Sequence, residues 1–245
     1  MKVLSETDTG LVRETNQDAY SADVFPSGDV WAVVCDGMGG VSGGQIASGI
    51  CVKRVSDAIT RGYRKGMTVN SAKNLLVSAI NAANTEIFEE AVKNPLLRGM
   101  GTTVVAVIVL GNIAVVAHVG DSRAYMIKDG MKAITKDHSL VQLLLDMGKI
   151  TPETAKVHPE RNVITRAVGS ENFVDTEIDI VDIDESTTLL ICTDGLNGYV
   201  DDSVILETVN KYGDLSAQKL VETANQSGGH DNVTVVLLAA DVQGE

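Results

Sequence analysis

The feature that most constrains this chain is an apolar run that ends on Asp-Gly and occurs twice. Residues 30–35 form the first run, and Asp36 follows it directly. Residues 188–193 form the second run, and Asp194 follows it in the same way. Short uninterrupted apolar runs are typical of strands buried on both faces. Two such strands that each deliver a carboxylate at one end predict a site for a hard cation such as Mg²⁺ or Mn²⁺.

An Asp-Gly pair after a strand is also the usual signal for a hairpin turn. After Gly37, however, the chain continues with more glycine and then a helical pattern, not with a partner strand. Gly37 has no side chain, so its backbone can approach a ligand closely. The doubled pattern favours a ligand site, and the turn remains the alternative.

Composition narrows the class of protein. The chain has 245 residues, of which 44% are hydrophobic, and this suffices for the core of one large domain or two small ones. The formal net charge of −13 argues against nucleic acid or an anionic membrane as the main partner. No apolar run reaches the roughly 18 residues that a membrane span needs, and we expect no signal peptide.

The three cysteines, Cys35, Cys51 and Cys192, lie in apolar stretches and form no CxxC pair. An odd number of cysteines without such spacing indicates side chains that are buried and reduced. We therefore expect a cytoplasmic protein without disulfides.

Hydrophobic periodicity predicts strands and helices that come in blocks. Strands are expected at residues 2–8, 18–25, 30–35, 103–110, 113–119, 125–127, 176–183, 188–193 and 232–240. Helices are expected at residues 46–61, 72–91, 140–147, 201–211 and 214–225, with caps at Asn70 or Ser71, at Asp201 and at Asp214. Because the two kinds do not alternate strictly, we predict one α+β domain over residues 1–245, with antiparallel sheets and helices outside them.

Residues 136–168 form a long connection without a strand pattern. A connection of this length in a compact domain is usually a lid or a binding loop, and a decorative insertion is the alternative. Thr151 before Pro152 predicts the start of a short helix within it.

Acidic residues at strand ends carry the predicted chemistry. Four aspartates border strands and lie near glycine or other small residues: Asp18, Asp36, Asp194 and Asp231. If the fold gathers them, they cannot all stay ionised without cations, because like charges raise one another's pKa. Two cations would make a shared water acidic, and the resulting hydroxide could attack a phosphorus atom. Arg13 could clamp the phosphate with its planar guanidinium, or it could be a solvated surface charge.

Other chemistries fit the sequence less well. No serine is placed with a histidine and an acid for acyl transfer, and no cysteine lies in the basic, exposed loop that a thiolate nucleophile needs. The glycines from Gly37 to Gly44 fit neither a GK[ST] phosphate loop nor the GxGxxG spacing of a dinucleotide site. We expect His118 and His230 either to be packed histidines or to hydrogen-bond groups that bind the metal, and not to be metal ligands themselves.

Six short motifs, in order along the chain, together resemble the type 2C (PPM) family of metal-dependent serine/threonine protein phosphatases, and in particular its compact bacterial members. The motifs are RETNQD at 13–18, DGMGG at 36–40, GTT at 101–103, GDSR at 120–123, TDG at 193–195 and GHDNVT at 229–234. Each motif is weak alone, and the combination is specific. Residues 136–168 resemble the flap of the bacterial enzymes, with the motifs DHSL at 137–140 and HPERN at 158–162. The resemblance implies a four-layer αββα sandwich, with two antiparallel β-sheets flanked by helix pairs.

The resemblance also implies roles for the acids, position by position. Asp36 would bridge two catalytic ions, and Gly37 would offer its carbonyl oxygen to one of them. Asp194 and Asp231 would complete the other, and Asp18 would hold metal-bound waters. The implied cofactor is Mn²⁺ or Mg²⁺.

Further positions follow from the same comparison. Arg13 would bind the substrate phosphate. Asp121, which from the sequence alone could be a turn residue, would hold a third ion together with Asp194. Some family members carry a histidine after the Asp-Gly pair as a proposed general acid, but this chain has Met38. His158 in the flap-like segment is therefore a candidate acid, and a substrate contact or simple packing of the lid are the alternatives.

The implied activity is hydrolysis of phosphoserine and phosphothreonine in proteins by a water that two metal ions activate. The implied partners are phosphoproteins modified by a eukaryotic-like Ser/Thr kinase, with no nucleic acid and no membrane, and we expect a monomer. Two alternatives stay open. A family member without catalysis could act as a scaffold, although no expected acid is missing, and the same site could hydrolyse small phosphate esters.

Overall fold

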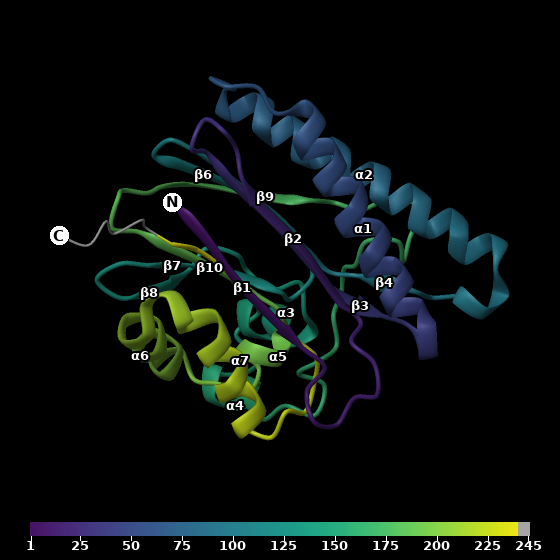
Figure 1. Ribbon diagram of the computed structural model, residues 1–245. Coiled ribbons are helices and arrows are strands. Elements are labelled where there is room, and N and C mark those ends of the chain that lie inside the picture. The colour runs from purple at the N-terminus through teal and green to yellow at the C-terminus, as the bar shows by residue number, and fades with distance from the viewer. Residues whose placement is uncertain (240–245) are drawn as a thin grey trace.

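The computed structural model describes residues 1–239 and contains two antiparallel sheets that pack face to face (Figure 1). The first sheet has the strand order β1 (Lys2–Asp8), β11 (Val233–Ala239), β10 (Thr188–Cys192), β7 (Arg123–Ile127) and β8 (Met131–Ala133). The second has the order β2 (Asp18–Val24), β3 (Val30–Met38), β5 (Val104–Leu110), β6 (Ile113–Val119) and β9 (Glu177–Asp182), with β4 (Gly101–Thr102) beside β3. The predicted last strand ends at Ala239, and Ala240 lies outside the described residues.

The central strands are buried on both faces, as their uninterrupted apolar sequences predict. On β3, Val33 packs against the helices α1 (Gly40–Gly62) and α2 (Val69–Lys93), which cover the outer face of the second sheet. The next residue, Val34, packs between the two sheets. This alternation is the two-residue period of a strand, so a strand between two covered faces needs apolar residues at every position.

A second helix pair covers the outer face of the first sheet. Helices α6 (Asp202–Tyr212) and α7 (Ser216–Gln226) bury Ile205 and Leu220 against Leu190 of β10. The layers are therefore helix pair, sheet, sheet and helix pair, and the predicted α+β sandwich is confirmed. No helix in residues 1–239 combines the length and the apolar character that a bilayer crossing requires.

The strand β3 continues past its predicted end at residue 35. It runs to Met38, because β2 pairs with it as far as Asp36 and β4 pairs with Gly37 and Met38. Asp36 therefore lies inside the strand and not after it. The neighbouring strands, which a local pattern does not contain, set this boundary.

Helix starts also differ from their predicted positions. Helix α1 begins at Gly40, not at residue 46, and α2 is capped by Thr68, whose hydroxyl accepts from the Ser71 N–H, and not by Asn70 or Ser71. Asp214 lies in the 3₁₀ turn η2 (Gly213–Leu215) before α7 and is not its cap. A second 3₁₀ turn, η1 (Pro95–Leu97), follows α2. Tertiary contacts override helix propensity at the glycine-rich start of α1, because Gly44 packs directly against Gly37.

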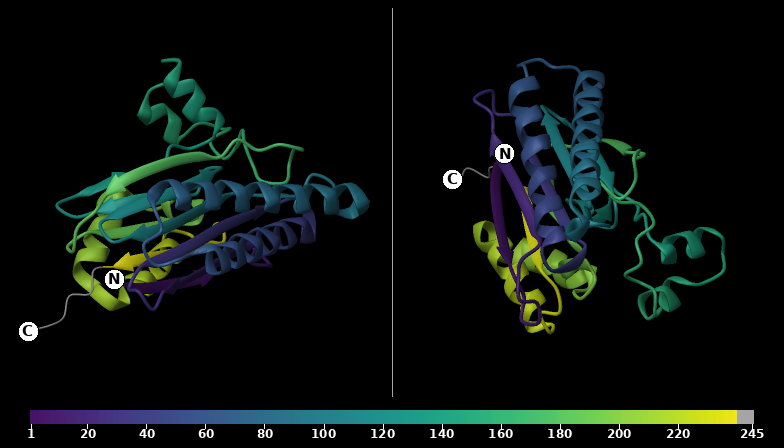
Figure 2. Two further views of the ribbon diagram at one scale, coloured as in Figure 1. Left: turned by 90° about the horizontal axis from the view of Figure 1, so that it is seen from above. Right: turned by 90° about the vertical axis from the view of Figure 1, so that its right-hand side faces the viewer.

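Residues 136–168, which we call the flap segment, extend to one side of the sandwich (Figure 2). The segment carries the short helices α3 (Leu140–Asp146) and α4 (Pro152–Lys156), and α4 has the expected cap at Thr151. Helix α3 buries none of its residues. A β-bridge between Ser139 and Ile164 joins the two ends of the segment.

Candidate active site

Strand register brings the first two predicted acids together. Asp18 opens β2 and lies directly opposite Asp36 on β3, so their Cβ atoms are roughly 5 Å apart. The backbone of Asp36 is held by Thr103, whose hydroxyl accepts from the Asp36 N–H (2.9 Å) and whose N–H donates to the Asp36 carbonyl (2.8 Å). The main chain thus fixes where the Asp36 carboxylate lies.

The other sheet delivers the remaining pair of acids. Asp194 is the first residue of the short helix α5 (Asp194–Asn197), just after β10, and Asp231 lies just before β11. Because β10 and β11 are antiparallel neighbours, the end of one meets the beginning of the other. Gly195 is required at this junction, since a Cβ there would lie 1.9 Å from the carbonyl oxygen of Asn232.

Asp36, Asp194 and Asp231 meet at one cavity of about 490 Å³. Six of the predicted site residues line it: Arg13, Asp36, Gly37, Asp121, Asp194 and Asp231. Asp18 does not line it and is held by hydrogen bonds to its Oδ2 from the hydroxyls of Thr193 (2.9 Å) and Thr234 (2.7 Å). We call Asp18, Asp36, Asp121, Asp194 and Asp231 the acid cluster. His158 is not among the residues that line this cavity, and its Nδ1 accepts from the Glu160 N–H within the flap segment.

Four members of the acid cluster, Asp18, Asp36, Asp121 and Asp194, resist ionisation. Burial, together with the neighbouring carboxylates, raises the pKa of Asp18 to about 7, of Asp121 to about 8 and of Asp194 to about 6. The same two causes raise the pKa of Asp36 well above its usual range. Four buried carboxyl groups with raised pKa values form a site in which positive charge is strongly favoured.

The chemistry of the oxygen atoms fits a divalent cation. Asp18 Oδ1 and Asp194 Oδ1 are buried and have no hydrogen-bond partner within the described residues. Buried carboxylate oxygens without donors are costly unless a cation neutralises them. Gly37 leaves no room for a side chain, because a Cβ there would come within 2.1 Å of the Gly44 carbonyl oxygen. Carboxylates and a close backbone together form the all-oxygen environment that Mg²⁺ and Mn²⁺ prefer.

Arg13 brings a positive charge to the mouth of the cavity. Its Nη2 lies 2.8 Å from Asp231 Oδ2, and this hydrogen bond raises the pKa of the guanidinium further. The side chain remains 54% exposed, so an anion in the cavity can also reach it. The exposed fork is suited to a phosphate group.

A family model matches most of the chain. The model described as protein phosphatase 2C covers residues 12–237. The chain belongs to the protein phosphatase 2C family. The serine/threonine phosphatase stp of Listeria innocua is 38% identical to this family member over 237 residues, which cover 95% of this chain and 93% of the relative. The resemblance drawn from the six motifs is confirmed.

Solved structures of other phosphatases share this fold. Serine/threonine phosphatase Stp1 from Staphylococcus aureus is similar with a TM-score of 0.91 and 34% identity, covering 99% of this chain and 95% of that one. The catalytic domain of the serine/threonine protein phosphatase PstP, solved in complex with two manganese ions, is similar with a TM-score of 0.84 and 33% identity over 96% of each chain. Metal dependence is therefore a property of the family to which this phosphatase 2C chain belongs.

Sequence reasoning missed the side chains that hold the acids in place. Asn232 accepts from the Gln17 N–H (2.8 Å) and donates to the carbonyls of Thr9 (2.9 Å) and Thr15 (3.0 Å), so it ties the loop that carries Arg13 to the start of β11. Its place directly after Asp231 is the only local signal for this role. The predicted packing of His118 is confirmed, since its side chain is fully buried.

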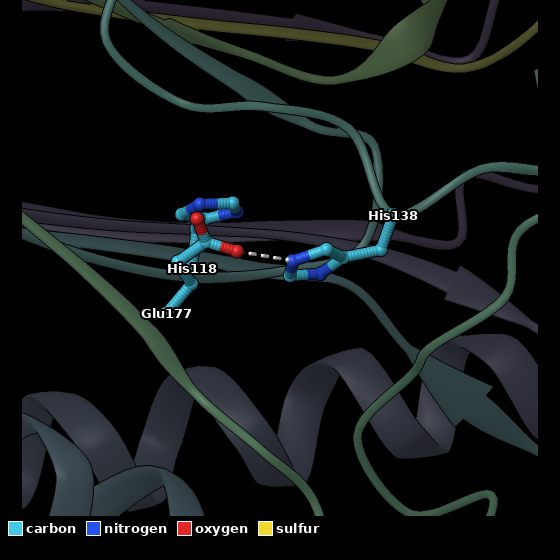
Figure 3. Close-up of side chains that lie close together, drawn as sticks. All are labelled: His118, His138 and Glu177. Carbon is cyan, nitrogen blue, oxygen red and sulfur yellow. Dashed lines mark hydrogen bonds and ion pairs between the residues drawn. The ribbon is translucent and has the colours of Figure 1, made fainter. Parts of the chain in front are cut away.

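A second polar group lies at the base of the flap segment (Figure 3). One ligand atom each of His118, His138 and Glu177 lies within 4.8 Å of the others. Arg166 also reaches this group, with its Nη1 3.1 Å from His138 Nε2. We call these four residues the flap-base cluster. From the sequence, His118 was expected to be a packed histidine and His138 was part of a flap motif, while Arg166 and Glu177 were not singled out.

Proposed function

We propose that this chain is a metal-dependent protein phosphatase that hydrolyses phosphoserine and phosphothreonine in proteins. The observation that carries the proposal is the convergence of buried, mutually repelling carboxylates with an exposed arginine at one cavity. The names of similar proteins, serine/threonine phosphatases from Listeria and Staphylococcus, support the same activity.

The residues that would hold two ions are Asp36, Gly37, Asp194 and Asp231, and Asp18 would orient waters from behind them. Divalent ions, when bound there, make a water acidic enough to attack a phosphate ester and offset the charge of the phosphoryl group. Both Mn²⁺ and Mg²⁺ suit this all-oxygen set. Asp121 and Asp194 are the proposed ligands of a third ion.

The chain's own groups orient the substrate. Arg13 would bind two phosphate oxygens with its fork, and this requires it to exchange its bond with Asp231 for the substrate. Met38 lines the cavity at the position after Gly37 and has no proton to donate. The proton for the leaving alkoxide must come from a water or from another side chain, and His158 stays a candidate substrate contact on the flap segment.

We further propose one catalytic domain over residues 1–245, with the flap segment as its lid, acting as a cytoplasmic monomer. The core between the sheets supports the single domain, because strands from both halves of the chain build it. The proposed substrates are phosphoproteins made by a eukaryotic-like Ser/Thr kinase. The net charge of −13 supports partners other than nucleic acid or membrane.

The test is hydrolysis of p-nitrophenyl phosphate and of a phosphothreonine peptide with Mn²⁺ or Mg²⁺ present. We expect turnover of both substrates and none above background for Asp36→Ala. Equal turnover by the variant would refute the proposal. A preference for free phosphoserine over the phosphopeptide would favour the small-ester alternative. Tight binding of a protein partner without ion uptake would favour a scaffold.

A further inference from the structure

His138, at the start of the flap segment, holds the Gly120 peptide from two directions. The Gly120 N–H donates to His138 Nδ1 (3.0 Å), and the His138 N–H donates to the Gly120 carbonyl (2.9 Å). The next residue, Asp121, belongs to the acid cluster and lines the cavity. His138 of the flap segment thus forms two hydrogen bonds to the backbone directly beside Asp121, a predicted metal ligand.

Gly120 is held from its other side as well. Its φ of +105° is a conformation that side chains disfavour, and a Cβ there would come within 2.5 Å of Thr103 Cγ2. The Thr103 hydroxyl also lies 2.7 Å from the Ser122 hydroxyl. The loop that carries Asp121 is therefore clamped between Thr103, which holds Asp36, and His138.

The hydrogen bonds define one tautomer of His138. Because Nδ1 accepts from Gly120, the single hydrogen of the neutral ring lies on Nε2, and it donates to Glu177 Oε2 (3.0 Å). This bond lowers the pKa of Glu177, which stays ionised as the acceptor. The Arg166 guanidinium beside Nε2 cannot donate to a nitrogen that already carries a hydrogen, and its Nη1 donates to the Asp175 carbonyl (3.1 Å). Glu177 thus selects the tautomer that Gly120 needs.

The same bonds argue against a metal ion among His118, His138 and Glu177. A neutral histidine that binds an ion through Nε2 must carry its hydrogen on Nδ1, and the Gly120 N–H occupies that side. The rings of His118 and His138 are also stacked, with centroids 4.8 Å apart and planes 12° apart, so their in-plane lone pairs do not converge. His138 and Glu177 instead form a hydrogen-bonded clamp on Gly120.

We propose that His138, in the tautomer that Glu177 selects, is a positioning residue that sets Asp121 for binding of the third ion. The inference rests on the role proposed above for Asp121. It also links that site to the flap segment, because the His138 carbonyl accepts from the Thr165 N–H (2.8 Å) at the far end of the segment. A conformational change at the base of the flap segment would therefore shift Asp121 through His138.

The experiment is calorimetric titration of the ion-stripped protein with Mn²⁺, without substrate. We expect His138→Ala to weaken the third ion about 10- to 100-fold, the usual loss when the partner that orients a ligand is removed, while the two tighter ions bind as before. His138→Asn should recover most of this loss, because its amide oxygen can take the place of Nδ1 toward Gly120. Lys136→Ala, which breaks an ion pair with Asp146 inside the flap segment, is the matched control and should change nothing.

Nitrogen NMR of the histidine rings gives a second readout that needs no ion. We expect Nδ1 of His138 without a hydrogen in the wild type and a mixture of tautomers in Glu177→Ala. A wild-type ring with its hydrogen on Nδ1, or equal third-ion affinity in wild type and His138→Ala, would overturn the clamp. A wild type that takes up only two ions would overturn the third site and the clamp together. Normal uptake of three ions without phosphatase activity would count against the proposed function alone.

Discussion

The acid cluster and the flap-base cluster lie beside the same loop, but their electrostatics are opposite. In the acid cluster, burial and like charges raise pKa values, and one oxygen each of Asp18 and Asp194 (Oδ1) has no hydrogen-bond partner within the described residues. In the flap-base cluster, Glu177 accepts from a neutral ring, and its pKa is lowered. His118, whose ring nitrogens also have no partner there, is kept neutral because burial lowers its pKa to about 4.

The difference shows how each cluster is stabilised. Unpaired carboxylates are among the costliest groups to bury, so the acid cluster needs cations from outside. A neutral imidazole costs much less, and in the flap-base cluster His138 and Glu177 are stabilised by hydrogen bonds within the protein. Neutralising one residue should therefore have opposite effects on the ion-free protein in the two clusters. The predictions below test this contrast.

The largest effect is expected for Asp36→Ala. This variant should lose phosphatase activity by at least about 1,000-fold, because the residue is expected to contact both ions and the loss of one preorganised electrostatic contact alone costs roughly 10²–10³. The measurement is kcat/KM for a phosphothreonine peptide with Mn²⁺. The control is Glu185→Gln, which removes one carboxylate from an exposed position. If Asp36→Ala keeps its activity within about tenfold of wild type, which is about 1.4 kcal/mol in activation free energy, the catalytic ions do not bind at Asp36.

A smaller loss is expected when Arg13 is replaced. Arg13→Ala should lower kcat/KM about 10²-fold, since one clamp on the phosphoryl group is lost, and Arg13→Lys should restore only part of it because an ammonium cannot bind two oxygens in one plane. Steady-state kinetics of both variants provide the check. Full activity in the lysine variant would mean that charge alone matters, and the exposed fork would have no special role.

The two clusters should also differ in their response to pH. In ion-free protein the raised pKa values of about 7 for Asp18, 8 for Asp121 and 6 for Asp194 mean that the folded state holds protons more tightly than the unfolded state. Their contribution to stability is complete below the unfolded pKa near 4 and is lost as pH rises through about 6–8. The melting temperature with EDTA should therefore fall between about pH 5 and 8.5.

Saturating Mn²⁺ should remove this fall, because ions bind the deprotonated carboxylates. Scanning calorimetry at several pH values, with and without the ion, makes the comparison. A melting temperature of the ion-free protein that stays level or rises over this range would contradict the electrostatics of the acid cluster.

The smallest effects are expected from single neutralising changes in ion-free protein. Asp194→Asn should raise the melting temperature because it removes one repelling charge, whereas Glu177→Gln should lower it because it weakens the bond from His138. For a chain of this size, about 1 kcal/mol corresponds to about 2–4 °C. Glu185→Gln on the surface again gives the reference. If the two variants shift the melting temperature in the same direction, the two clusters do not differ in how they are stabilised.

Much of the fold followed from local patterns. The apolar runs at 30–35 and 188–193 became buried strands, and the strands expected at 103–110 and 113–119 pair as the neighbours β5 and β6. Local sequence patterns gave the wrong bounds for elements whose ends are set by contacts with neighbouring strands or loops. The last residues of β3 are strand because β2 and β4 pair with them, and α1 starts early because Gly44 packs on Gly37.

The sequence by itself determined which side chains border strands, because burial on one or two faces leaves a period that can be counted along the chain. It thereby indicated acids near strand ends, while the resemblance of the six motifs implied their roles and the four layers around them. Only the tertiary structure decided that Asp18 lies opposite Asp36 and that His138 holds Gly120, because register and loop docking depend on contacts between residues far apart in the chain. The sequence shows each carboxylate of the acid cluster separately. Their mutual repulsion, which metal ions would neutralise, exists only after folding has brought them together.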